Sequence, residues 1–230
     1  MKFHFITFAD KNYKQKQEKL VNHVKTFNEY ESVLSYDYDW LKQTDFYKQN
    51  KFILDKPRGC GYWLWKPYII LDCLQSIPEN DCCVYLDCGD VIKEGATNYF
   101  EHVLENESCL LLGGGYIQKD WTKRDCFHYM NCDSSVYYDV VQLEAGFQVW
   151  KNCQQSIEIL EEQIKYGKDY RIITDSPNEC GLPNYDGFVD HRHDQSILTN
   201  LAVKHSLPVD HPSHNTYKHA RSYIICNVEI

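Results

Sequence analysis

The sequence predicts a single α/β domain with a mostly parallel central sheet flanked by helices. Short runs rich in β-branched and aromatic residues alternate with longer amphipathic stretches through the first half of the 230-residue chain. This alternation is typical of strands joined by right-handed helical crossovers. The chain is also long enough to bury a substantial core, and no internal repeat or low-complexity linker divides it.

The first expected strand, 3–8, starts almost at the initiator, and a Lys-, Gln- and Glu-rich helix at 12–28 follows it with its apolar residues on one stripe. The strand expected at 140–150 is interrupted by Ala145 and Gly146, which either a closely approaching ligand or a β-bulge explains. The other expected strands are 32–36, 82–87 and 108–113, the last ending in three glycines, and the other expected helices are 39–50, 62–77, 96–106, 152–166 and 196–205.

The later part of the chain is expected to be less regular. A loop rich in Pro, Gly and Asn covers 175–187, and the His- and Pro-containing tail at 208–222 is expected to be irregular. A long loop inside a compact domain is usually functional, so we expect 175–187 to be an acceptor lid or a binding loop.

The composition excludes several classes of protein. A net charge of −9 without any basic stripe argues against a nucleic-acid partner. No apolar run approaches the ~20 residues of a membrane span, and the N-terminus does not have the pattern of a signal peptide. The eleven cysteines form no Cys-x-x-Cys pair, and many lie in apolar runs where a reduced thiol acts as a small hydrophobe. We therefore expect a cytoplasmic protein.

Two acids lie at the end of an apolar run that is expected to form a buried central strand. The strand 82–87 ends at Asp87, and Gly89 separates this acid from Asp90. Ligands of open α/β sheets bind outside the carboxyl ends of the strands, and Mg²⁺ or Mn²⁺ binds carboxylates together with substrate phosphates. A metal–nucleotide site is therefore predicted at Asp87 and Asp90. The alternative is that Asp87 caps a turn while Asp90 is solvated.

A second candidate segment is GCGYWLWKPY at 59–68. Its glycines allow a close approach of the backbone to a ligand, its aromatic residues could stack on a base or sugar, and Lys66 offers a point charge for phosphate. Arg58, which precedes the segment, and Tyr62 within it are further candidates for binding the donor. The alternative is a helix start with aromatic residues in the core.

The third candidate segment is HRHDQS at 191–196. Asp194 is either the N-cap of the helix that follows or a general base, and His193 is a second candidate for proton transfer. Glu144, in the interrupted strand, is a third candidate for that role.

Together the runs GCGYWLWKPYIILDCL, VYLDCGD, WTKRD, QLEAGFQVWKN and HRHDQSIL resemble the small GT-A-fold sugar-nucleotide glycosyltransferases of the capsule, lipopolysaccharide and large-DNA-virus type. The resemblance spans residues 3–200. It implies a GT-A-like single domain with a Rossmann-like sheet, in which about 1–115 bind the nucleotide sugar and about 116–230 form the more irregular acceptor side. The implied reaction moves a sugar, from UDP-sugar as the expected donor, to a hydroxyl of a glycan acceptor.

The resemblance also implies roles for single residues. Lys66 would contact the donor diphosphate, and the nucleoside would lie at Thr7, Phe8 and Ala9. The metal-binding Asp-x-Asp motif falls on Asp87, Cys88, Gly89 and Asp90, with the second acid displaced by one position. Asp194 would face the acceptor, and the strand at 144–147 would shape the sugar pocket.

Two other readings use the same residues. A metal-dependent nucleotidyltransferase or phosphohydrolase would need the two acids but no sugar acceptor. A non-catalytic sugar-binding protein would need only the aromatic residues, of which Tyr alone contributes 18.

Overall fold

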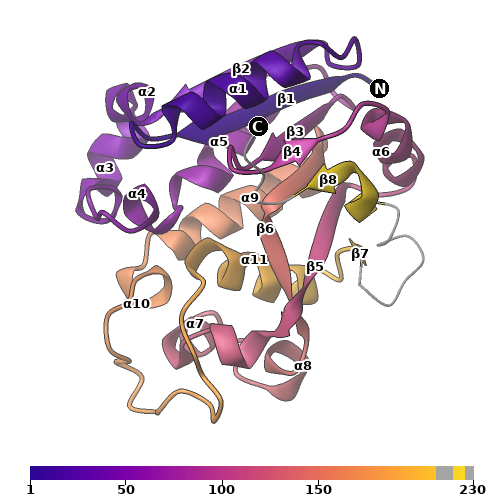
Figure 1. The fold of residues 1–230 in the computed structure, drawn as a ribbon. Helices are drawn as coiled ribbons and strands as arrows, with labels where there is room; N and C mark the ends of the chain where they lie inside the picture. Colours follow the sequence, from indigo (N-terminus) through magenta and orange to yellow (C-terminus); the bar gives the residue numbers. More distant parts are fainter. Residues whose placement is uncertain (211–219, 226–230) are drawn as a thin grey trace.

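A six-stranded sheet in the order β2-β1-β3-β6-β5-β7 forms the centre of the computed structural model, which describes residues 1–210 and 220–225 (Figure 1). β6 is antiparallel to both of its neighbours, while the other pairings are parallel, so the predicted mostly parallel sheet is confirmed. The short strands β4 and β8 pair separately. The strands are β1 (Phe3–Ala9), β2 (Ser32–Asp37), β3 (Cys82–Leu86), β4 (Val91–Ile92), β5 (Cys109–Ile117), β6 (Val141–Lys151), β7 (Val209–Asp210) and β8 (Ile224–Ile225).

Helices cover both faces of this sheet. The central strands carry apolar side chains on both faces, and each face packs against helices. In β3 and β6, Tyr85 and Trp150 pack into one apolar cluster with α5, α9 and α11, whereas Val84 and Val149 pack into a second cluster with α1 and α6. Successive side chains of a strand point to opposite faces, so one apolar run supplies both layers. The helices that contribute are α1 (Lys14–Val24), α5 (Trp65–Ser76), α6 (Ala96–Leu104), α9 (Gln154–Gly167) and α11 (His193–Lys204).

The remaining helices are short and lie at the ends of the sheet. The helix expected at 39–50 is divided at Thr44, because the Thr44 hydroxyl accepts a hydrogen bond from Tyr47 N (3.1 Å) and so begins a new helix. These helices are α2 (Tyr38–Gln43), α3 (Asp45–Leu54), α4 (Gly59–Tyr62), the 3-10 helix Gln118–Trp121, α7 (Arg124–Tyr129), α8 (Ser135–Tyr138) and α10 (Tyr170–Ile173).

The helix expected at 12–28 is shorter, the one expected at 62–77 begins at Trp65, and the one expected at 196–205 begins at His193. Two expected boundaries in the sheet and the tail are also wrong. The strand predicted at 108–113 runs through its glycines to Ile117, because β6 continues to pair with it. The tail expected to be irregular at 208–222 begins with β7, which pairs with the outer edge of β5, and its residues 211–219 lie outside the described part of the chain.

The predicted interruption of the strand at 140–150 is a β-bulge. Against β5, the pairing of β6 jumps from Gln148 to Glu144, so the residues between them have no partner in that strand. On the other side, Gly146 O accepts a hydrogen bond of 2.8 Å from Asp87 N, just beyond the end of β3. The bulge therefore lies beside the predicted acid motif.

None of the helices in residues 1–210 and 220–225 has the length and apolar character needed to cross a membrane. The ten cysteines in the same part of the chain are free thiols, and most of them are buried.

Phe100 tests the second apolar cluster. It is fully buried in α6 and contacts the rings of Phe3 and Phe147. We expect Phe100→Ala to lower the free energy of unfolding by about 3–5 kcal/mol, because the truncation leaves a cavity. Phe52→Ala is the matched control, since this side chain is 69% exposed, and we expect a change within about 1 kcal/mol. Equal losses in denaturant titrations would contradict the assigned core.

Candidate active site

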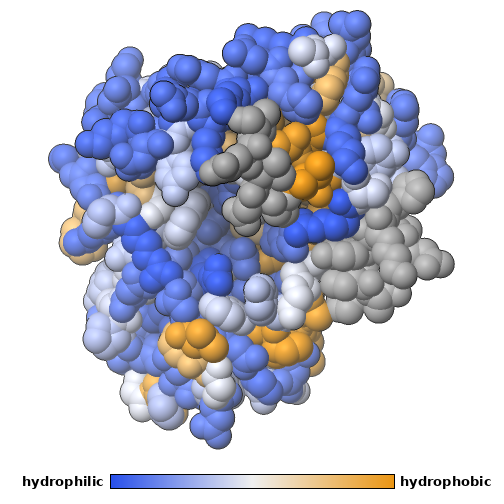
Figure 2. Space-filling model, in the orientation of Figure 1, coloured by the Kyte–Doolittle hydropathy of each residue, from blue (hydrophilic) through white to orange (hydrophobic). Residues whose placement is uncertain are grey.

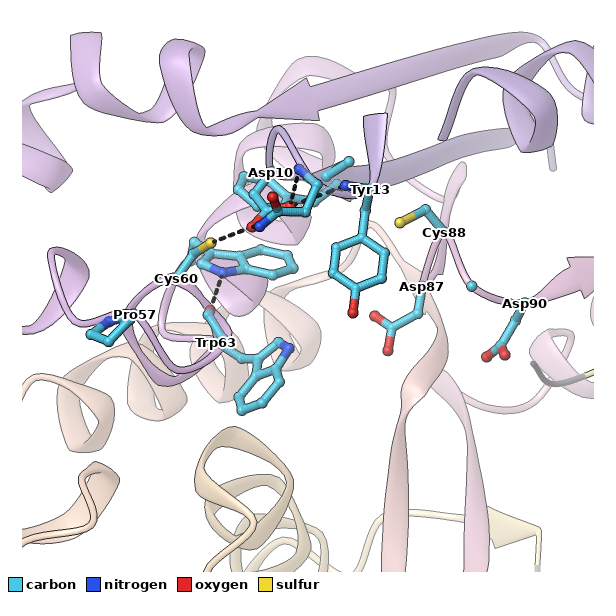
Figure 3. A pocket seen from close by; sticks show the side chains of 14 residues that line it. Asp10, Tyr13, Pro57, Cys60, Trp63, Asp87, Cys88 and Asp90 are labelled. Atoms are coloured by element: carbon cyan, nitrogen blue, oxygen red, sulfur yellow. Dashed lines mark hydrogen bonds between the residues drawn. The ribbon is translucent and has the colours of Figure 1, made fainter. Parts of the chain in front are cut away.

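A cleft of about 560 Å³ lies at the carboxyl ends of β1 and β3 (Figure 3). Its wall is built by the end of β1, the segment before α5 and the loop after β3. The Trp65 indole stacks on the Phe8 ring with 3.8 Å between the ring centroids and donates a hydrogen bond to Gly59 O, which joins the first two segments. Six of the predicted ligand-binding residues line this cleft: Phe8, Ala9, Asp87, Cys88, Gly89 and Asp90.

The two acids of the motif converge on one place. The Asp87 Oδ1 atom accepts a hydrogen bond from the Tyr85 hydroxyl, whose pKa burial raises well above its usual range, so that the phenol stays protonated. A Cβ built on Gly146 would lie 3.1 Å from Asp87 Oδ2 and 3.5 Å from Asp90 Oδ2. Both carboxylates point to the same side of the cleft in Figure 3. The glycine therefore leaves open the space that both acids face.

This arrangement fits a divalent cation that takes some of its ligands from the protein and the others from a substrate. Within residues 1–210 and 220–225 no group of three or more His, Cys, Asp or Glu side chains could hold a metal by itself. Mg²⁺ and similar ions are usually held by one or two carboxylates plus substrate phosphates. Asp87 and Asp90 match that donor set, with the open space beside Gly146 next to them.

Lys66 lies between two carboxylates that are far apart in the sequence. Its Nζ atom is 3.4 Å from Asp87 Oδ1 and 3.3 Å from Asp194 Oδ2, and it donates a hydrogen bond of 3.1 Å to Ala145 O in the bulge. The residue is 2% exposed. Burial by itself would lower the pKa of Lys66, but the attraction of the two carboxylates outweighs burial and raises it. The side chain is therefore a fixed, buried positive charge.

Asp194 lies in the first turn of α11 and does not cap it. The residue before the helix is Arg192, which makes no side-chain capping bond, and the Asp194 carboxylate turns inward to Lys66. The N-cap alternative is therefore wrong. Burial and the negative charge of Asp87 raise the pKa of Asp194 to about 6, against the opposing effect of Lys66. Asp194 is thus a carboxylate at neutral pH that takes up a proton more readily than an exposed one.

His193 is a buried neutral side chain. Its Nδ1 atom lies 2.7 Å from Ile173 O, which can only accept, so this nitrogen donates. Burial lowers the pKa of His193 to about 4, and its ring packs against the rings of Tyr62 and Trp63. The Nε2 atom lies 3.6 Å from Asp175 Oδ1.

The segment before α5, which contains the short helix α4, is a left-handed turn. Five consecutive residues, 59–63, have φ between +51° and +93°. The non-glycine members each carry a steric cost of about 1–2 kcal/mol. Gly61 is required here, because a Cβ would lie 2.5 Å from Leu54 Cα. The turn places Trp63 where it lines both the large cleft and a smaller pocket beside it.

The smaller pocket, of about 180 Å³, brings together residues from four parts of the chain. It shares Trp63 and Asp87 with the large cleft. The other residues that line it are Arg58, Lys66, Ala145, Gly146, Arg192, His193, Asp194 and Gln195.

Three predicted site residues lie elsewhere. Thr7 is fully buried behind the cleft, where its carbonyl accepts a hydrogen bond from Gln17. Tyr62 packs on His193 and lines neither of the two pockets. Glu144 forms an ion pair of 2.6 Å with Arg221; burial raises the pKa of Glu144, and Arg221 opposes this effect.

Asp10 and Tyr13 line the cleft although they were not predicted, and Trp63 lines it as one of the aromatic residues of the candidate segment 59–68. Asp10 follows β1 directly, so the rule that identified Asp87 after its strand also points to Asp10. Which aromatic residue of 59–68 would reach the cleft could not be predicted, because the position of Trp63 depends on the left-handed turn.

Lys66 allows a test of the buried charge cluster. We expect Lys66→Ala to lower the free energy of unfolding by about 3–5 kcal/mol, since it leaves buried carboxylate charge without its partner. Lys2→Ala is the control, because Lys2 pairs with Glu31 on the exposed surface and should change stability by less than about 1 kcal/mol. A Lys66→Ala variant as stable as the Lys2→Ala variant would argue against a charged, buried Lys66.

No protein-family model and no curated protein matches the chain. Solved structures do. The whole chain superposes on 46% of the WbbM bifunctional glycosyltransferase with a TM-score of 0.55 and 13% identity, so it spans less than half of that protein. It also superposes on 95% of a glycosyltransferase involved in the glycosylation of the major capsid of PBCV-1 (0.51, 10%) and on 96% of mouse xyloside xylosyltransferase 1 (0.51, 11%). The chain therefore has the GT-A-like fold of these glycosyltransferases.

Proposed function

We propose that the protein is a glycosyltransferase that moves a sugar from a nucleotide sugar, most simply a UDP-sugar, to a hydroxyl group of a glycan acceptor. The observation that carries this proposal is the buried Lys66, which pairs with Asp87 in the large cleft and with Asp194 in the adjoining pocket. Lys66 would thereby connect the donor site at Asp87 to a proton acceptor, Asp194, at the carboxyl edge of the sheet. The fold shared with glycosyltransferases supports the same conclusion.

The large cleft suits the nucleotide part of the donor. Its volume of about 560 Å³ lies within the range of ligand pockets. The stacked rings of Phe8 and Trp65 and the carboxylates of Asp87 and Asp90 all line the cleft. The nucleoside would bind beside Phe8 and Ala9, and the diphosphate would extend to the acids. Mn²⁺ or Mg²⁺ held by Asp87 and Asp90 would neutralise charge on the leaving diphosphate.

We assign Lys66 a positioning role in place of the direct diphosphate contact that the family resemblance implies. Its ammonium is already surrounded by Asp87, Asp194 and the Ala145 carbonyl, and the residue is almost fully buried. It would hold Asp87 with one oxygen inward and the other toward the cleft. It would also keep the buried Asp194 ionised.

Asp194 is the best candidate for accepting the proton of the acceptor hydroxyl. Its carboxylate lies in the small pocket beside the large cleft, where the transferred sugar would bind. Glu144 is paired with Arg221, and His193 is held by Ile173 through its Nδ1 atom. As the acceptor oxygen bonds to the sugar carbon, its proton would pass to Asp194 and the nucleoside diphosphate would leave.

The purified protein can be incubated with a panel of nucleotide sugars, Mn²⁺ and glycan acceptors to test this function. Release of nucleoside diphosphate that depends on an acceptor would support it. Release of nucleoside monophosphate would indicate a nucleotidyltransferase or phosphohydrolase instead, and binding without turnover would indicate a sugar-binding protein.

Asp87→Asn tests the metal. We expect this variant to lose the increase in UDP affinity that Mn²⁺ produces in the parent protein, and its turnover to fall by more than tenfold, equivalent to ~1.4 kcal/mol. Asp39→Asn, at an exposed acid on α2, is the matched control and should bind UDP as the parent does. Calorimetric titration of UDP with and without Mn²⁺ measures both. If Mn²⁺ still strengthens UDP binding in Asp87→Asn, Asp87 is not a ligand of the metal.

Asp194→Asn tests proton transfer, because the amide has nearly the same shape but cannot take up a proton. We expect turnover to fall by at least about a hundredfold while the circular dichroism spectrum stays unchanged. In the parent protein the rate should fall as the pH is lowered through about 6, since protonation of Asp194 removes the base. Asp139→Asn, at an exposed ion pair with Lys119, should keep the turnover of the parent protein. Near-normal turnover in Asp194→Asn would exclude it as the base.

A further inference from the structure

A third cavity, of about 370 Å³, lies under the long loop that precedes α11. The loop 175–187 is held firmly against α7 although it has no regular secondary structure. The fully buried Asp125 accepts hydrogen bonds of 2.9–3.0 Å from Glu179 N and Cys180 N, and Arg124 N donates to Asn184 Oδ1 at 2.8 Å. These hydrogen bonds hold the loop in place as one wall of the cavity.

This cavity adjoins the pocket that contains Asp194. Arg58 lines both spaces. Asp175, on the wall of the cavity, lies 3.6 Å from the Nε2 atom of His193, the residue that precedes Asp194. A ligand in the cavity could thus extend past Arg58 toward the reacting atoms. Figure 2 shows that the hollowed surface between the two halves of this face is mainly hydrophilic.

The two cations of the cavity are already neutralised by protein groups. Arg58 is paired with Asp175 at 3.0 Å and with Asp190. Lys123 is buried, lies 3.7 Å from Asp125 and donates a hydrogen bond of 2.6 Å to Ser176 O. A phosphate, sulfate or carboxylate would find no unpaired cation among the residues that line this cavity, and it would face the charges of Asp175 and Asp190.

The other groups suit hydroxyl-rich, uncharged ligands. Asn178 is used within the protein, because its amide donates to Leu182 O and Asn184 Oδ1 and accepts from Asp125 N. The Ser176 hydroxyl and the NH2 group of Asn184 are the groups offered to a ligand, and the half-buried Phe188 offers the flat apolar surface that a sugar ring can cover. Paired carboxylates such as Asp190 retain lone pairs that can accept from sugar hydroxyls.

We propose that this cavity binds the acceptor and selects an uncharged sugar rather than a phosphorylated, sulfated or uronic one. The inference rests on the proposed glycosyltransferase function and adds the chemical class of the acceptor to it. The terminal sugar would lie against Phe188, Ser176 and Asn184, with its reacting hydroxyl directed past Arg58 to Asp194.

Binding of methyl glycosides to the full chain tests this proposal by saturation-transfer NMR in the presence of UDP and Mn²⁺. The panel contains neutral methyl hexosides and pentosides together with the corresponding uronic acid and 6-phosphate derivatives. We expect at least one neutral glycoside to bind, more tightly than its charged derivatives. Phe188→Ala should weaken that binding about three- to tenfold, as loss of an aromatic contact does. Val189→Ala, at the neighbouring exposed residue, should leave it unchanged.

Three results would overturn the proposal. They are tighter binding of the charged derivatives, binding of the neutral glycosides that Phe188→Ala does not change, and no binding of any glycoside. Turnover of nucleotide sugars separates this failure from failure of the proposed function. If turnover depends on an acceptor but binding of the glycoside is unchanged in Phe188→Ala, the glycosyltransferase proposal stands and the acceptor cavity is wrong. If neutral glycosides bind in a way that depends on Phe188 but no nucleotide sugar is turned over, the cavity binds neutral sugars and the glycosyltransferase proposal is wrong.

Discussion

The buried positive charge of Lys66 is the interaction on which the rest of the site depends. It joins the start of α5, the loop after β3, the bulge of β6 and the start of α11 through contacts of 3.1–3.4 Å. A buried ion cluster is stable only when every charge in it has a partner, because each unpaired ion carries a large desolvation cost. The four segments are therefore held in one relative arrangement, and with them the two pockets.

Two departures from regular backbone geometry make room for ligands around this charge. The bulge of β6 brings Gly146 beside Asp87 and Asp90, where its missing side chain leaves space for a cation or phosphate. The left-handed turn at 59–63 places Trp63 on the wall between the two pockets. Strained backbone persists only where the surrounding structure determines it, and here packing on Leu54 and His193 does so.

Much of the fold follows from local patterns. The runs that became β1, β3 and β6 were predicted within a few residues. β3 is the clearest case, because a strand buried on both faces requires a continuous apolar stretch. Asp87 and Asp90 were predicted for the same reason, since polar residues that end such a strand reach the carboxyl edge of the sheet. Asp10 obeys the same rule and was missed because its strand ends in one acid rather than two.

The sequence by itself determined the layered sheet, the acid motif at its edge and the polar segment at the start of α11. Only the tertiary structure decided which charges meet. Lys66, Asp87 and Asp194 are far apart along the chain, and their contact depends on how α5 and α11 cross the sheet, which no local pattern encodes. The same packing turned Asp194 inward, paired Glu144 with Arg221 and buried Thr7 behind the cleft. Side-chain direction at a helix start or in a bulge is set by neighbours from distant segments, so a residue type alone could not distinguish a cap from a base.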